Sequence, residues 1–228
     1  MDYIKQNINT IKANIAKACL QIGKNPADIM LLAASKQQTP DKIGHAISAG
    51  VDAVGENYCS ELLEKYDRGA YQNAPLHFIG RFQSNKAKYL VGKTALIHSL
   101  CSKTGAESIQ KQAKNLGITQ EVLLQVNVAG EDAKAGLLEN QIPEFLEFLS
   151  QMDSIKVRGL CSIVPQNQVD AHYFKKMRQL FVDISAKKYD NVIMEYLSMG
   201  MSGDYEQAIL HGANIVRLGS VIFGSRVY

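Results

Sequence analysis

The feature that most constrains the fold is an alternation of short β-type runs with amphipathic helical patterns along the whole chain. Between the runs, apolar residues recur at helical spacing, for example at Ile142, Phe145, Leu146 and Leu149. Such an alternation is typical of parallel sheets joined by crossover helices. The expected strands are residues 29–35, 51–54, 77–80, 95–98, 121–128, 156–163, 192–197 and 215–218.

An additional helix precedes the first of these strands. Ile4, Ile8, Ile11 and Ile15 fall on one helical stripe, and Gly23 ends the pattern. Eight β units with an extra N-terminal helix predict a closed (β/α)8 TIM barrel, in a single domain spanning residues 1–228. An open, doubly wound sheet is the alternative architecture.

Composition excludes several other classes of protein. The 228 residues include 25 Lys and Arg against 22 Asp and Glu, without a basic run, so nothing indicates a nucleic-acid partner. The longest apolar run, residues 29–34, is too short to span a membrane. The four cysteines are widely separated, which argues against a zinc site or a disulfide framework. We therefore expect a soluble, cytoplasmic protein.

A lysine stands directly after the first expected strand. In a barrel of this kind, functional side chains lie at the carboxyl ends of the strands, and Lys36 has that position. Partial burial there lowers the pKa of an amine, which favours Schiff-base formation with a carbonyl ligand. The alternative is a lysine that only marks where the strand meets solvent.

The ends of the last two expected strands are rich in glycine and serine. Ser202 lies after the seventh strand, and Arg217, Gly219 and Ser220 lie at the end of the eighth. Glycines allow close backbone approach, and hydroxyls and helix-start amides bind anions, so these residues predict a phosphate site. The alternatives are tight turns and helix caps, with Ser202 as an N-cap. Asn57, after the second strand, either contacts a ligand or caps the following helix.

These two groups of residues suggest one ligand with a carbonyl at one end and a phosphate at the other. Pyridoxal 5′-phosphate (PLP) has both groups, and so does a phosphosugar substrate of a Schiff-base aldolase. The residues by themselves do not choose between a PLP protein and an aldolase.

Several motifs in order resemble one known family. They are residues 32–36, 55–58, 77–80 with 83–86, 198–204, 216–220 and 222–226. Together they resemble the YggS/PROSC family of PLP homeostasis proteins, and the likeness runs from about residue 5 to the C-terminus. The sequence departs from the usual family pattern at Leu100, Cys101, Cys161 and Ser220, none of which is the proposed Schiff-base lysine.

The resemblance implies a barrel like the N-terminal domain of alanine racemase and a set of PLP contacts. Lys36 would hold the cofactor as an aldimine, with Ser202, Gly219 and Ser220 at the phosphate. Arg217 would lie beside the pyridine nitrogen and Asn57 near the ring. The implied function is to bind, buffer and deliver PLP, with effects on amino-acid and vitamin B6 metabolism and possible transient contact with PLP-dependent apoenzymes.

We expect binding without robust catalysis. A permanent cation at Arg217 disfavours protonation of the pyridine nitrogen and weakens the cofactor as an electron sink. The chain ends at Tyr228, without the β domain that supplies the second base of alanine racemase, so we also expect a monomer. Weak racemase or transaminase activity and a phosphosugar aldolase are the alternatives. Lys86 and Lys134 are weaker candidates for secondary carbonyl-capturing amines.

Overall fold

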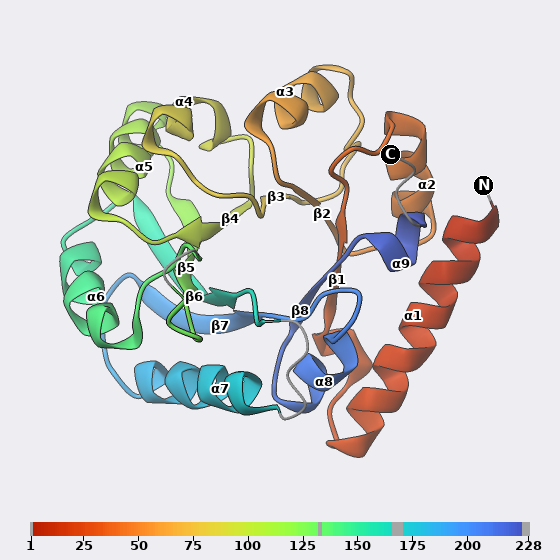
Figure 1. Ribbon diagram of the computed structural model, residues 1–228. Coiled ribbons are helices and arrows are strands. Elements are labelled where there is room, and N and C mark those ends of the chain that lie inside the picture. The colour runs from red at the N-terminus through yellow and green to blue at the C-terminus, as the bar shows by residue number, and fades with distance from the viewer. Residues whose placement is uncertain (1, 132–133, 166–170, 225–228) are drawn as a thin grey trace. The chain divides into compact units, whose positions relative to one another are not determined.

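The chain folds into a closed parallel barrel. The computed structural model describes residues 2–131, 134–165 and 171–224, which form eight strands in the order β1-β2-β3-β4-β5-β6-β7-β8 (Figure 1). The predicted barrel is therefore confirmed, and the open sheet was the wrong alternative. Residues 225 and 226 of the last motif, and Tyr228, lie outside the described residues.

Each predicted strand corresponds to an observed one, with ends that differ by a few residues. The second strand lies two residues later at both ends, and the third, fourth and fifth strands each differ by two residues at the carboxyl end. The observed strands are β1 (Met30–Ala34), β2 (Ala53–Glu56), β3 (Leu76–Phe78), β4 (Leu96–Leu100), β5 (Gln120–Val126), β6 (Ile155–Ser162), β7 (Val192–Ser198) and β8 (Ile215–Leu218).

The helices follow the strands as the periodicity predicts. Between the predicted fourth and fifth strands, the apolar pattern at Ala106, Ile109 and Ala113 belongs to a helix whose N-cap is Ser102 and which ends at Gly117. The helices are α1 (Asp2–Gln21), α2 (Pro40–Ser48), α3 (Cys59–Asp67), α4 (Ala87–Leu90), α5 (Lys103–Leu116), α6 (Ile142–Ser150), α7 (His172–Ser185), α8 (Tyr205–Leu210) and α9 (Ser220–Phe223), with short 3-10 turns η1 (Pro26–Asp28), η2 (Ser84–Lys86) and η3 (Glu139–Gln141).

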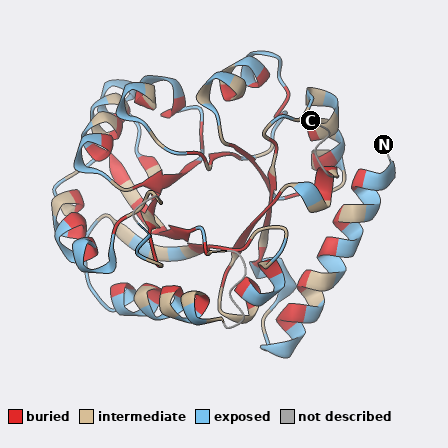
Figure 2. Ribbon diagram, viewed as in Figure 1, coloured by how far each residue is buried: buried red, intermediate tan, exposed pale blue. Residues whose placement is uncertain are grey.

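The chain divides into two compact units, the first made of residues 1–77 and 199–228. In this unit β1 pairs in parallel with β2 on one side and with β8 on the other, and Leu32 lies opposite Arg217. The apolar stripe of α1, including Ile4 and Ile8, is buried in one cluster with residues of β1, α8 and β8. In Figure 2, buried and exposed residues alternate along α1, because one side of the helix is buried and the other is exposed. In the first unit, α1 and β8, which come from early and late parts of the chain, therefore share one apolar core with β1.

The second unit comprises residues 78–198 and contains β4 to β7. Its strands pair in parallel, each with the next along the chain. The register shifts between β6 and β7 near Gly159, which has a φ of +144°. A Cβ at this position would overlap the backbone of Tyr196 in β7, so only glycine fits there.

The described residues provide neither a membrane-spanning helix nor a metal-binding cluster. None of the helices in the described ranges is long and apolar enough to cross a membrane. Over the same residues, no group of three or more His, Cys, Asp or Glu side chains could hold a metal ion. All four cysteines, Cys19, Cys59, Cys101 and Cys161, are free thiols.

Candidate functional site

The first site residue, Lys36, follows β1 at its carboxyl end. β1 ends at Ala34, Ser35 is fully buried, and Lys36 is half-buried. The next residue, Gln37, adopts a φ of +61°, so the chain turns sharply directly after the lysine. A run of aliphatic residues, from Leu31 to Ala34, thus places an amine at the edge of the barrel, as the sequence predicted.

Asn57 follows β2, the neighbour of β1, but does not cap the next helix. The N-cap of α3 is Tyr58, whose side chain makes no capping hydrogen bond. Asn57 Oδ1 is buried without a hydrogen-bond partner among the residues that the structure describes. The capping interpretation of Asn57 is therefore wrong, and contact with a ligand stays the prediction for this side chain.

Ser202, Gly219 and Ser220 meet where the chain leaves β7 and β8. Ser202 Oγ accepts a hydrogen bond from the backbone amide of Gly219 at 3.3 Å, and Gly219 is the N-cap of α9. Ser202 is half-buried and Ser220 is exposed. The expected N-cap role of Ser202 is wrong, because α8 begins after Asp204 instead.

Arg217 lies within β8 and is almost completely buried, with 7% of its surface exposed. Its backbone amide donates to the carbonyl oxygen of Gly200 at 3.0 Å, which ties β8 to the loop after β7. Arg217 is opposite Leu32 in the β1–β8 register. Arg217 therefore lies on the strand that pairs with β1, and β1 is the strand that leads to Lys36.

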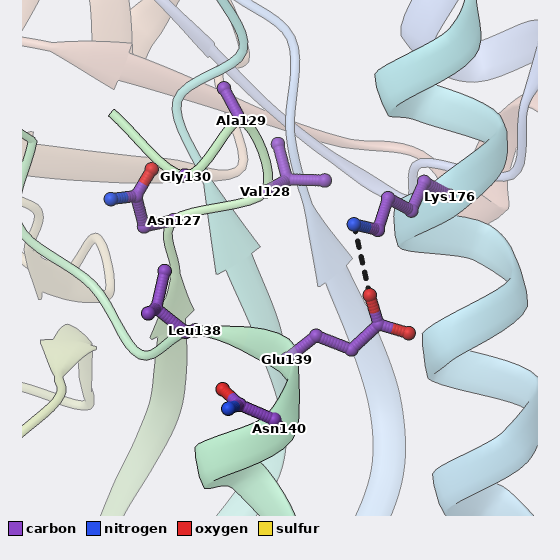
Figure 3. A pocket seen from close by; sticks show the side chains of 8 residues that line it. All are labelled: Asn127, Val128, Ala129, Gly130, Leu138, Glu139, Asn140 and Lys176. Atoms are coloured by element: carbon purple, nitrogen blue, oxygen red, sulfur yellow. Dashed lines mark ion pairs between the residues drawn. The ribbon is translucent and has the colours of Figure 1, made fainter. Parts of the chain in front are cut away.

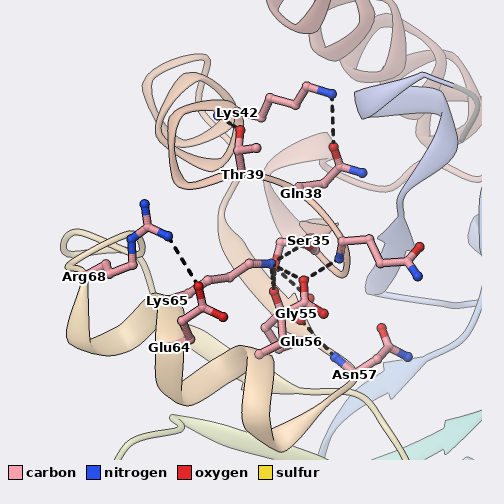
Figure 4. Close-up of polar contacts among 12 residues, drawn as sticks. Ser35, Gln38, Thr39, Lys42, Gly55, Glu56, Asn57, Glu64, Lys65 and Arg68 are labelled. Carbon is pink, nitrogen blue, oxygen red and sulfur yellow. Dashed lines mark hydrogen bonds and ion pairs between the residues drawn. The ribbon is translucent and has the colours of Figure 1, made fainter. Parts of the chain in front are cut away.

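A buried polar assembly beside Lys36 was not predicted from the sequence. Lys65 Nζ in α3 donates to Glu56 Oε1 at 2.6 Å, to Glu61 Oε1 at 2.6 Å and to the carbonyl oxygen of Ser35 at 2.7 Å. Ser35 Oγ donates to Glu56 Oε1 at 2.6 Å. Figure 4 shows Lys65 reaching across to Glu56 and Ser35 at the ends of β2 and β1. The sequence signal that could have indicated this assembly is Glu56, a glutamate at the end of an otherwise apolar strand.

Burial dominates the electrostatics of this assembly. Desolvation raises the pKa of Glu56 above its ordinary range, while the hydrogen bonds from Lys65 and Ser35 act in the opposite direction. Burial also raises the pKa of the nearby Tyr71 hydroxyl, and the carboxylates of Glu56 and Glu61 raise it further. The assembly therefore depends on close pairing of its charges.

A separate cavity of about 480 Å³ lies in the second unit (Figure 3). Lys176 of α7 and Glu139 of η3 form an ion pair at 2.9 Å at its edge. Asn127 Nδ2 donates to the carbonyl oxygens of Glu131 and Lys134, so this amide supports the loop after β5. None of the predicted site residues lines this cavity. The lining residues are Asn127, Val128, Ala129, Gly130, Leu138, Glu139, Asn140 and Lys176.

The two secondary lysines both lie in the second unit. Lys134 pairs with Glu131 at 2.9 Å, and Lys86 Nζ lies 6.0 Å from the centre of the Tyr89 ring. Neither observation tests carbonyl capture by these amines, which stays a prediction.

Comparison with known proteins connects this arrangement to one family. Residues 2–227 match the family model described as alanine racemase, N-terminal domain. A curated protein of Aquifex aeolicus, named pyridoxal phosphate homeostasis protein, is 41% identical over 226 residues and is covered to 98%, as is this chain.

Two solved structures are also similar over nearly the whole chain. A protein of unknown function from Bifidobacterium adolescentis has 32% identity and a TM-score of 0.86, and the match covers 97% of this chain and 95% of that one. PipY of Synechococcus elongatus, in a structure with PLP bound, has 30% identity and a TM-score of 0.80. That match covers 92% of this chain and 100% of PipY.

Proposed function

We propose a function from one premise: this chain belongs to the alanine racemase N-terminal domain family, whose model spans residues 2–227. The proposed function is PLP homeostasis, in which the protein binds PLP through Lys36, buffers it and delivers it to other proteins. Relatives that match the whole chain carry the name pyridoxal phosphate homeostasis protein, and PipY has been solved with PLP bound.

One observation supports this proposal: four of the six predicted site residues lie in or just after β1 and β8, which pair, Asn57 follows β2, and Ser202 lies in the loop after β7. β1 pairs with both β2 and β8, and these strands lead to the predicted amine and to the predicted phosphate ligands. The six residues are Lys36, Asn57, Ser202, Arg217, Gly219 and Ser220.

The residues present fit PLP in their chemistry. An amine at Lys36 suits an aldehyde, and the hydroxyls of Ser202 and Ser220 suit a phosphate. Asn57 Oδ1, buried without a partner in the described part of the chain, offers an acceptor that a bound ligand would satisfy.

Each residue has a distinct role in this proposal. The Lys36 amine would hold PLP covalently, because bound PLP would supply an aldehyde for Schiff-base formation with loss of one water molecule. Ser202 and Ser220 donate hydrogen bonds to the phosphate, and Gly219 lets the backbone approach it. Arg217 holds a permanent positive charge in a nearly buried position.

The buried cation at Arg217 also supports binding over catalysis. Most PLP enzymes keep the pyridine nitrogen protonated so that the ring accepts carbanion charge, and a guanidinium beside that nitrogen opposes its protonation. We therefore expect no robust turnover. Slow racemisation or transamination is the alternative function, and an aldolase without PLP is the third. The recipient apoenzymes, a monomeric state and a cytoplasmic location stay predictions.

The experiment that tests this function is the near-visible absorbance of three purified proteins after incubation with PLP and desalting. The wild type should retain a yellow band that borohydride fixes to Lys36, as peptide mass spectrometry would show. Lys36→Ala should lose the band completely. Lys42→Ala, which removes another lysine of the same unit, should behave as the wild type does.

Three outcomes would contradict the proposal or parts of it. If the wild type desalts without colour and without bound PLP, PLP binding is refuted, and binding of phosphosugars then points to the aldolase. If Lys36→Ala keeps the borohydride-fixed band, the assignment of Lys36 is wrong. Sustained turnover of an amino acid by the pure protein would replace the carrier function with the enzymatic one.

A further inference from the structure

Two residues of α3, one helical turn apart, hold the backbone on both sides of Lys36. Lys65 Nζ donates to the carbonyl oxygen of Ser35, the residue before the lysine, at 2.7 Å. Glu61 Oε1 accepts from the backbone amide of Gln37, the residue after it, at 2.5 Å. Figure 4 shows Lys65 of α3 directed towards the end of β1. The peptide groups that flank the predicted Schiff-base lysine are therefore fixed by a different element.

The ammonium of Lys65 has no spare donor in this arrangement. Its three hydrogen atoms match three acceptors, which are Glu56 Oε1, Glu61 Oε1 and the Ser35 carbonyl oxygen. The side chains of Lys65 and Glu56 are 6% and 0% exposed. Charge-assisted hydrogen bonds in such a buried place are strong and directional, so the assembly resists displacement.

The backbone after Lys36 is in a conformation that needs support. Gln37 has a φ of +61°, in the left-handed region that non-glycine residues occupy at a cost of about 1 kcal/mol or more. The backbone amide of Gln37 donates a hydrogen bond to Glu61 Oε1 in α3, so this bond stabilises the turn directly. Strained turns of this kind persist when surrounding contacts over-determine them.

The same assembly reaches the second predicted site residue on β2. Glu56 Oε2 accepts from the backbone amide of Asn57 at 3.3 Å, while Glu56 Oε1 accepts from Lys65. A single buried carboxylate thus connects the strand end that carries Asn57 to the one that carries Lys36.

We propose that Glu61 and Lys65 are positioning residues that orient Lys36 for covalent capture of the PLP aldehyde. This inference rests on the proposed function. It separates the site into two parts: α3 controls covalent capture at Lys36, and the residues after β7 and β8 hold the phosphate independently of α3. Without the bond from Glu61, the turn at Gln37 relaxes, the amine loses its orientation, and the phosphate contacts persist.

Glu61→Ala tests this proposal, with Glu64→Ala as the matched control. Glu64 lies on the same helix and forms an exposed pair with Arg68, so its removal changes α3 without touching the assembly. Affinity is measured for PLP and for 4-deoxypyridoxine 5′-phosphate, which has the same ring and phosphate but no aldehyde. Hydrogen exchange of the peptide containing residues 36–38 is measured in the same proteins without any ligand.

Glu61→Ala should weaken PLP binding about tenfold and leave binding of the deoxy compound within about twofold, because only covalent capture depends on Lys36. The Gln37 amide should exchange about tenfold faster in Glu61→Ala, since it loses its acceptor. Glu61→Gln keeps an acceptor oxygen and should recover most of both effects. Glu64→Ala should match the wild type throughout.

Two results would overturn the positioning role. Equal weakening of both ligands in Glu61→Ala would indicate general damage to the site, and exchange and PLP affinity equal to the wild type would show that Glu61 does nothing for Lys36. If the wild type binds neither ligand, the proposed function fails instead. Hydrogen exchange without ligand then decides whether Glu61 holds the turn after Lys36.

Discussion

Among single residues, this protein buries polar side chains in two ways: as a charged, ion-paired group and as a neutral imidazole. Glu56 and Lys65 are paired and hydrogen-bonded in a nearly water-free place. His77, in β3, is 3% exposed, and burial lowers the pKa of its imidazole to about 4. His77 is therefore neutral in the folded protein at neutral pH, as expected of a histidine inside an apolar strand.

The lowered pKa of His77 predicts a loss of stability in acid. The unfolded imidazole titrates near pH 6.5, so the contribution is complete above that pH and is lost as the pH falls towards 4. The full difference amounts to about 3 kcal/mol. Urea unfolding of His77→Asn at pH 7.5 and 4.5 should show a smaller acid loss than the wild type shows. His45→Asn, on exposed α2 surface, should keep the wild-type acid loss, and equal losses in all three proteins would refute this role of His77.

At the scale of elements, the pairing of β6 with β7 depends on one glycine. Gly159 has a φ of +144° at the point where the β6–β7 register shifts, and a Cβ there would overlap the Tyr196 carbonyl. Both the backbone conformation and the close approach exclude any side chain. The irregular register between these strands is therefore built on the absence of a Cβ.

Gly159→Ala should destabilise the protein by more than about 3 kcal/mol, because the methyl group must displace β7 or force β6 out of its conformation. The measurement is the free energy of unfolding from urea titration. Gly203→Ala is the control, since a Cβ at Gly203 meets no atom within 4 Å, and its effect should stay within about 1 kcal/mol. Similar unfolding midpoints for the two variants would contradict this prediction, because they would show that β7 can move to accommodate the methyl group at little cost in free energy.

At the scale of the whole molecule, the proposed ligand connects strands from the two ends of the chain. Lys36 follows β1, and Gly219 follows β8, which pairs with β1. A ligand bound to both residues crosses the junction where the last strand meets the first. Ligand binding and closure of the barrel at this junction should therefore support each other.

PLP should accordingly raise the melting temperature of the wild-type protein. A ligand at about 100 times its Kd adds about 2.7 kcal/mol, which for a chain of this size corresponds to roughly 5–10 °C. Differential scanning calorimetry with and without PLP measures this shift. Lys36→Ala should keep only the part that the phosphate contributes. A wild-type melting temperature that is insensitive to PLP at any concentration would contradict specific binding to the native state.

The repeating pattern, and with it the barrel, can be predicted from the amino-acid sequence alone. Apolar runs and helical spacing are local properties, and eight repeats of one unit leave few ways to bury every strand. The position of Lys36 followed from the same reasoning, because a buried run that ends in a lysine places that amine at a strand end. Strand ends were less predictable: β2 extends to Glu56, whose buried carboxylate pairs with Lys65, and no local pattern reveals that pairing.

Which polar groups meet depends on the packing of the folded chain and cannot be predicted from local sequence patterns. From the sequence, Glu61 and Lys65 have the spacing of an ordinary pair on an exposed helix face, yet the folded chain buries Lys65 against residues 9 and 30 positions earlier. Asn57 and Ser202 had the residue types of helix caps, but neither caps a helix. The physical reason is that a hydrogen bond needs its two atoms within about 3 Å. Partners far apart in sequence reach that distance only after β1, β2 and α3 have packed.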